Sequence, residues 1–254
     1  MEIEAKFGGD AATMVEFCYF FVKRVVDLDS PQQRMLLAEE LADVLVRNLK
    51  VCEVTILGAG MYGAAASLPG FKVLKLTTDE GEADASSKLI GQRLTNVVSF
   101  YSAHRLEGKK VINTFLEQSG ARNICVLTLE RLDRIGLGKA AFDRTLGEIV
   151  DRVKGKYRLY PTELDSLDPR DYEMDMKRAS LEIQEQLSVL GKPFNEIAHG
   201  LAELRSFEIY AVDVHSNNVG YRTRDRAYKI FDIGLSAAQG VSEIPTLKNP
   251  RKSS

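Results

Sequence analysis

The sequence predicts an α+β protein with two lobes that share a cleft, preceded by a helical extension. Residues 30–50 indicate a helix, because Ser30 can cap it, Pro31 suits its first turn and apolar residues share one face. After residue 52 short apolar runs typical of strands replace this pattern, and the helical pattern returns from residue 177. The chain has 254 residues, enough for one large core or for two lobes that share a cleft. The predicted divisions are 1–50 for the extension, 51–132 for the N-lobe and 133–254 for the C-lobe.

Composition excludes several classes of function. The 34 basic and 36 acidic residues give a net charge of -2, so we expect no nucleic-acid binding. Cys18, Cys52 and Cys125 are odd in number and lie among apolar residues, which indicates a reducing, cytoplasmic environment. Charged residues interrupt the apolar stretch 14–26, so neither a signal peptide nor a membrane span is expected.

A glycine cluster follows the first apolar run. Gly58, Gly60 and Gly63 would let backbone N–H groups approach phosphate oxygens closely. A dinucleotide-binding fold also explains the cluster, with Asp79 near the position that grips a ribose. That fold needs a helix of ten or more residues after the glycines, and residues 64–68 are too few. We therefore predict a strand–turn–strand hairpin, for which an ordinary glycine-rich hairpin without a ligand remains an alternative.

A lysine lies on the next predicted strand. Strand alternation puts Lys75 on the same face as Val73 and opposite Leu74. If that face lines a nucleotide cleft, Lys75 can hold phosphates while a helix carboxylate holds the lysine. Glu82 is the first candidate for that carboxylate and Glu80 the second, whereas a simple preference of acidic residues for a helix N-terminus explains each equally well.

The most informative residues lie near the end of the sequence. Asp213 precedes Asn218 by five residues, and Asp232 lies at the end of the next predicted strand, two residues before Gly234. Phosphoryl transfer needs one carboxylate to orient the acceptor hydroxyl and separate oxygen ligands for magnesium. Asp213 suits the first task, and a hairpin would bring Asn218 and Asp232 together for the second. His215 is explained equally by a loop hydrogen bond and by contact with phosphate or substrate.

The motifs GAGMYG, VLK, DVHSNN and FDIG, in this order, resemble the protein-kinase-like superfamily from about residue 54 to residue 236. The histidine two residues after Asp213 resembles the pattern of aminoglycoside phosphotransferases and other small-molecule kinases. The motifs FDIGLS and NNVGY look most like those of atypical phage and bacterial kinases. The resemblance implies a bilobal protein-kinase-like fold with a short, reduced C-lobe, and ATP and Mg²⁺ as cofactors.

The resemblance also implies a role for each motif residue. ERL, at residues 130–132, resembles the hinge at which backbone groups hold adenine. The implied nucleotide-binding residues are Gly58, Gly60, Gly63, Lys75, Glu82, Glu130 and Leu132, the catalytic residues Asp213 and Lys75, and the metal ligands Asn218 and Asp232.

The sequence departs from the family pattern at two places. Ala211 and Val212 stand before Asp213, where a histidine and an arginine are usual, so support for that loop must come from elsewhere. Only 20 residues follow Gly234, and we find no A-P-E motif. An additional element must then present the acceptor, and the apolar helices within residues 11–50 pack either on the lobes or on a protein partner.

The expected function is phosphoryl transfer from ATP to a serine or threonine of a protein. One alternative is a small-molecule hydroxyl kinase, which the D-x-H-x-x-N form favours. Another is a pseudokinase that serves as an interaction module, against which the retention of Lys75, Asp213, Asn218 and Asp232 argues.

Overall fold

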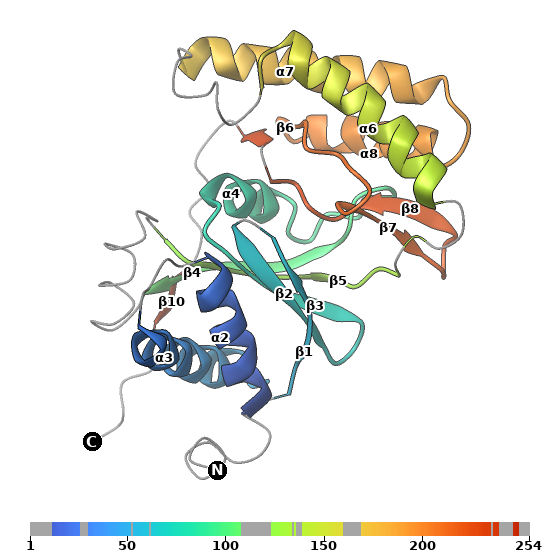
Figure 1. Cartoon of the computed structure of the whole chain (residues 1–254). Helices are drawn as coiled ribbons and strands as arrows, with labels where there is room; N and C mark the ends of the chain where they lie inside the picture. The colour runs from blue at the N-terminus through green and yellow to red at the C-terminus, as the bar shows by residue number, and fades with distance from the viewer. Residues whose placement is uncertain are drawn as a thin grey trace. The chain divides into compact units, whose positions relative to one another are not determined.

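The computed structural model has the predicted α+β class (Figure 1). Its elements form two compact units, of which unit 1 contains residues up to Ala83, Phe100–Arg131 and the segment from Glu243, and unit 2 contains Asp84–Ser99 and Leu132–Ser242. The structure describes residues 12–25, 30–51, 53–60, 62–107, 123–133, 135, 139–159, 169–234, 236–238 and 246–248. Cys52, Met61, the start of the chain and the end of the tail lie outside these residues.

Unit 1 is built on a six-stranded sheet in the order β1-β2-β3-β5-β4-β10. Neighbours are antiparallel except β10, which lies parallel to β4. Lys75 is paired with Ala65 on one side and with Leu127 on the other, so it sits on a central strand. The strands are β1 (Thr55–Ala59), β2 (Gly63–Leu68), β3 (Lys72–Thr77), β4 (Phe100–Glu107), β5 (Cys125–Glu130) and β10 (Thr246–Lys248).

Two helices, α2 (Ala12–Val25) and α3 (Pro31–Leu49), pack together against this sheet (Figure 1). Their apolar faces form one buried cluster with alternate residues of β3, Leu74 and Leu76. Lys75 lies between these two residues in the strand, so its side chain leaves the opposite face. The apolar excess of the N-terminal helices is therefore buried within unit 1, where it stabilises the sheet.

The start of α3 differs in detail from its prediction. Ser30 occupies the N-cap position, but its side chain makes no capping hydrogen bond. Pro31 stands in the first turn, where its fixed backbone angle suits a helix and its missing N–H group is not needed. The helix begins and ends within one residue of the predicted range because its apolar face, rather than its cap, fixes it.

Unit 2 combines three long helices with two small sheets. Helix α7 contacts both α6 and α8, and α8 packs on β6 and β8. Strand β6 pairs with β9, and β7 forms a hairpin with β8. The elements are α6 (Lys139–Lys156), α7 (Pro169–Ser188), α8 (Phe194–Arg205), β6 (Ile209–Ala211), β7 (Val219–Arg222), β8 (Ala227–Ile230) and β9 (Ser236–Ala238).

Several predicted elements are displaced or shortened. The helix predicted from residue 177 begins at Pro169, and the strands predicted at 209–214 and 227–233 end at Ala211 and Ile230. Both strands end before the aspartate, so Asp213 and Asp232 lie in the loops that follow β6 and β8. Helix α6 and strands β4, β7, β9 and β10 (Thr246–Lys248) were not predicted.

Two segments belong to a different unit from the one that sequence order suggests. Residues 84–99 lie with unit 2, because Asn96 and Val98 exchange backbone hydrogen bonds with Ile230 of β8. The segment from Glu243 lies with unit 1, because β10 extends its sheet. Pairing between residues far apart in the sequence thus overrides the simple division of the chain at residue 132.

The described cysteines behave as small apolar residues. Cys18 and Cys125 are buried and form no disulfide, and burial raises the pKa of the Cys18 thiol well above its ordinary value. Among the described helices, none is both long enough and apolar enough to cross a membrane.

The packing of α3 can be tested with a matched pair of substitutions. Leu41 is fully buried and Leu36 is 60% exposed on the same helix. Leu41→Ala is expected to lower the free energy of unfolding by about 2–5 kcal/mol, because it leaves a cavity in the core. Leu36→Ala should change it by less than about 0.5 kcal/mol. Urea unfolding measures both, and equal losses would contradict the packing described.

Candidate functional site

The glycine cluster forms a β-hairpin in unit 1. Strands β1 and β2 pair antiparallel, and the Gly60 N–H group donates to the Gly63 carbonyl over 2.8 Å. A strand, not a helix, follows the glycines directly, so the predicted hairpin is confirmed and the dinucleotide-binding alternative is excluded.

The three glycines differ in their surroundings. A Cβ atom at Gly63 would lie 2.4 Å from the Leu76 carbonyl oxygen, so close packing of β2 on β3 demands glycine there. A Cβ atom at Gly58 or Gly60 would meet nothing within 4 Å. Packing therefore does not explain these two glycines, whereas close approach of a ligand to their backbone would.

Lys75 forms an ion pair with Glu82, 2.5 Å from Nζ to Oε1. Glu82 lies in the first turn of α4 (Glu80–Lys88), and the two side chains are 16% and 3% exposed. The second candidate, Glu80, instead accepts a hydrogen bond from Asn123. The structure thus decides between the two carboxylates that the sequence left open.

Asp79 has a local task. Its Oδ1 accepts the Glu82 backbone N–H at 3.0 Å, which is the contact of an N-capping side chain. The Thr77 hydroxyl in turn accepts the Asp79 N–H. This cap fixes the first turn of α4 and hence the position of Glu82, and it accounts for the acidic residue that a ribose-binding interpretation would have used.

The residues predicted as a hinge belong to different units. Glu130 is the last residue of β5 in unit 1, and in the register of the sheet it lies opposite Lys72 of β3. Leu132 lies in unit 2, where its side chain occupies the space that a Cβ atom at Gly220 would need. Their part in adenine binding stays a prediction.

The remaining predicted residues lie together in unit 2, at one end of the β7–β8 hairpin. They are Asp213, Asn218 and Asp232. The register pairs Val219 with Ile230, which puts Asn218 beside Phe231, and the Phe231 N–H donates to the Asn218 carbonyl. Asn218 Nδ2 donates to the Asp213 backbone carbonyl at 2.7 Å. Asp232 follows Phe231, and its Oδ1 accepts the Gly234 N–H at 3.1 Å.

Two basic side chains flank the Asp213 carboxylate. Lys154 Nζ lies 3.1 Å from Oδ1, and His215 Nε2 lies 3.6 Å from Oδ2. His215 Nδ1 accepts the Asn217 N–H, so in a neutral ring the proton is on Nε2, the nitrogen that faces Asp213. Burial acts to raise the pKa of Asp213, but His215 and Lys154 together outweigh it and lower that pKa to about 2.

Lys154 is the residue that the sequence analysis missed. It lies on α6, on the same buried face as Leu146, Val150 and Val153. A charged residue on an otherwise apolar helix face is the signal that could have identified it. Lys154 supplies the cation that the residues directly before Asp213 lack.

Asn218 and Asp232 are the residues at this hairpin end that could hold a magnesium ion. The Asn218 side-chain nitrogen donates a hydrogen bond to the Asp213 backbone carbonyl, so the side-chain oxygen of Asn218 is the atom that can coordinate a metal ion. Asp232 adds a carboxylate. Mg²⁺ prefers oxygen ligands and commonly uses few protein groups together with phosphates and water. Within the described residues no cluster of three or more His, Cys, Asp or Glu that could hold a metal ion is present.

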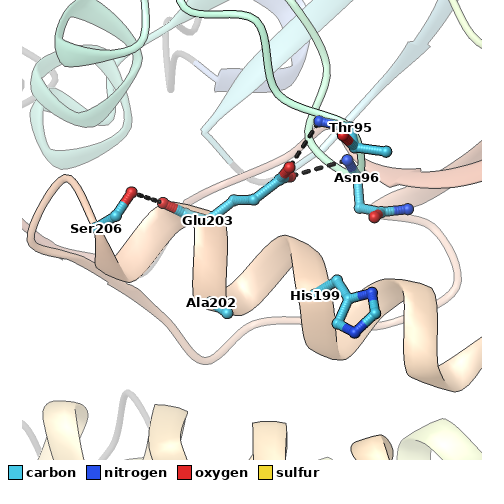
Figure 2. A pocket seen from close by; sticks show the side chains of 6 residues that line it. All are labelled: Thr95, Asn96, His199, Ala202, Glu203 and Ser206. Carbon is cyan, nitrogen blue, oxygen red and sulfur yellow. Dashed lines mark hydrogen bonds between the residues drawn. The ribbon is translucent and has the colours of Figure 1, made fainter.

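A shallow depression of about 470 Å³ lies elsewhere in unit 2 (Figure 2). Its lining residues are Thr95, Asn96, His199, Ala202, Glu203 and Ser206, and none of them is a predicted site residue. The Glu203 carboxylate accepts the backbone N–H groups of Thr95 and Asn96 at 2.7 and 2.8 Å, as Figure 2 shows. Glu203 therefore fastens the 95–96 segment to α8.

The lowered pKa of Asp213 predicts how stability depends on pH. A carboxyl group whose folded pKa of about 2 lies below its unfolded value of 3.8 stabilises the fold above pH 4, and this contribution is lost as the pH falls toward 2. The free energy of unfolding of the wild type should thus drop by about 1–2 kcal/mol more than that of Asp213→Asn over this range. Urea unfolding at several pH values measures this, and parallel curves would contradict it.

Comparison of the chain with models of known protein families gives no match. Comparison with curated protein sequences gives none either. The function proposed below therefore depends on the side chains of the two units and on their chemistry.

Proposed function

We propose that the chain is an ATP- and Mg²⁺-dependent phosphotransferase with a bilobal protein-kinase-like fold, whose acceptor is a serine or threonine hydroxyl of a protein. The observation that supports this most is the ion pair between Lys75 on a central strand and Glu82 on the following helix. Nucleotide binding is assigned to Gly58, Gly60, Gly63, Lys75, Glu82, Glu130 and Leu132. Orientation of the acceptor hydroxyl is assigned to Asp213, and Mg²⁺ binding to Asn218 and Asp232.

Stability alone is a poor explanation of the Lys75–Glu82 pair. Taking both charges out of water costs several kcal/mol, and a well-packed apolar pair in the same place is often neutral or more stable. The pair does hold an ammonium group at a fixed point on the sheet face that the helices leave uncovered. A fixed cation near a glycine hairpin is what the α- and β-phosphates of ATP require.

The ionisation of Asp213 limits its task. With a pKa of about 2 the carboxylate is charged at neutral pH and is a weak base. It can accept a hydrogen bond from the acceptor hydroxyl and orient it, but it holds a full proton poorly. This suits a loose phosphoryl-transfer transition state, in which the hydroxyl loses its proton late.

Asn218 and Asp232 are the residues that would hold Mg²⁺. When bound, the ion neutralises the charge of the phosphates and of the transferred group. The chain itself orients these ligands: Asn218 through its bond to Asp213, and Asp232 through the Gly234 N–H group.

A small-molecule hydroxyl kinase is the second candidate. His215 lies against the carboxylate that would orient the acceptor, and it is part of the D-x-H-x-x-N form typical of small-molecule phosphotransferases. A pseudokinase is less favoured, since an interaction module has no need for two nearly buried cations paired with Glu82 and Asp213.

The function is tested by incubating the protein with Mg²⁺ and γ-labelled ATP, alone, with dephosphorylated casein and with kanamycin. Label on casein or on the protein itself supports a protein kinase, and label on kanamycin the alternative. Lys75→Met should lower transfer about 100-fold or more, because the phosphates lose their cation. Lys72→Met is the control, because Lys72 lies on the same strand but stacks over Tyr101. Activity that both variants retain would refute the role of Lys75.

The metal ligand is tested separately. Asp232→Ala should abolish Mg²⁺-dependent tightening of ATP binding while the fold persists, because it removes a carboxylate ligand of the ion. Asp225→Ala is the control, since Asp225 lies in the turn at the other end of the same hairpin and pairs with Arg222. Isothermal titration with ATP, with and without Mg²⁺, measures the effect, and an unchanged Mg²⁺ dependence in Asp232→Ala would exclude this ligand.

A further inference from the structure

Lys154 is a cation on a face that otherwise consists of apolar side chains. Its side chain is 10% exposed, and it shares its face of α6 with Leu146, Val150 and Val153. An ammonium group in such a place costs several kcal/mol unless a partner compensates it. Lys154 Nζ donates to Asp213 Oδ1 at 3.1 Å, and Asp213 lies 59 residues further along the chain.

Another lysine of the same helix shows what an ordinary ion pair looks like here. Lys156 is 57% exposed and pairs with Glu182 of α7 at 2.6 Å. Water solvates such a pair, and its net contribution is small. Lys154 differs because it points inward to the residue that the proposed function makes central.

Three contacts hold three different atoms of Asp213. Lys154 lies at Oδ1, His215 lies beside Oδ2, and Asn218 donates to the backbone carbonyl. Neither Ala211 nor Val212 has a polar side chain that could add to them. Of the three contacts, only that of Lys154 comes from outside the loop.

We infer that Lys154 is a positioning residue for phosphoryl transfer: from α6 it holds the Asp213 carboxylate in the orientation that accepts the hydrogen bond of the acceptor hydroxyl. The inference rests on the proposed function. Lys154 acts through Asp213 and takes no part in holding ATP, so it contributes to the rate of transfer rather than to nucleotide affinity.

The experiment compares the full-length wild type with Lys154→Met, Lys154→Arg and Lys156→Met. Transfer from γ-labelled ATP to dephosphorylated casein and to the protein itself gives kcat, and isothermal titration gives the Kd for Mg-ATP. Lys154→Met should lower kcat roughly 10- to 100-fold, the range for a misplaced catalytic group, and change the Kd by less than about twofold. Lys154→Arg keeps the charge and should recover most of kcat, and Lys156→Met should match the wild type.

A double substitution separates positioning from a general structural effect. If Lys154 acts through Asp213, then Lys154→Met should lower kcat little further in an Asp213→Asn background. Multiplying losses in the double variant would overturn the inference. If Lys154→Met does not fold by circular dichroism, Lys154→Gln, which keeps a polar end, takes its place in the same comparison.

The outcomes distinguish the inference from the function on which it rests. A wild type that neither binds Mg-ATP nor transfers label refutes both. An active wild type, with an unchanged kcat in a folded Lys154→Met or Lys154→Gln variant, overturns the positioning role alone. Equal losses in kcat and in Mg-ATP affinity overturn it as well, because they indicate a collapsed site.

Discussion

A lysine ammonium group that is nearly buried is costly unless a partner compensates it, and this constraint organises the candidate residues within each unit. Lys75 in unit 1 is held by Glu82, and Lys154 in unit 2 is held by Asp213. In each case the cation and the carboxylate come from different segments of the chain, so the pair fixes one segment against another. Because removing one partner would leave an uncompensated charge, each pair also restricts which conformations its unit can adopt.

The same constraint explains why one face of the sheet in unit 1 is apolar and the other carries the charged pair. One face is filled by α2, α3 and the alternate residues Leu74 and Leu76, so it has no room for a charge. Lys75 is directed to the other face by strand alternation alone. The cap that Asp79 provides then sets the first turn of α4 so that Glu82 reaches the lysine. Local geometry and core packing together thus determine where the cation is held.

Sequence reasoning succeeded where the signal is local. The distance from the glycines to the next strand predicted a hairpin, and alternation placed Lys75 opposite Leu74. It could not choose between Glu82 and Glu80, because both lie in the first turn of one helix and only the partners, Lys75 and Asn123, distinguish them. Asp79 was open to two interpretations for a similar reason.

Local patterns did not show which distant residues pair with one another. Lys154 and Asp213 are 59 residues apart, and the helix that carries the lysine was not predicted. Strand β10 pairs with β4, and the segment at Asn96 pairs with β8, although neither short segment has a pattern of its own that would indicate this. Such pairings depend on edges that exist only once the rest of the fold has formed.

Lys154 and His215 contact the Asp213 carboxylate, so its ability to bind the hydroxyl of a phosphoryl acceptor depends on the hydrogen-bond positions that these contacts leave. A carboxylate has about four lone-pair positions on its two oxygens, so one contact to each oxygen does not exhaust its capacity to accept hydrogen bonds. The pKa of about 2 means that the group stays an acceptor, rather than becoming a donor, throughout the physiological range. Holding Asp213 through Lys154 and His215 therefore fixes the direction of its remaining acceptor positions without using them up. The same contacts that make Asp213 a poor proton store make it a well-directed hydrogen-bond acceptor, which is the property that in-line transfer to a hydroxyl requires.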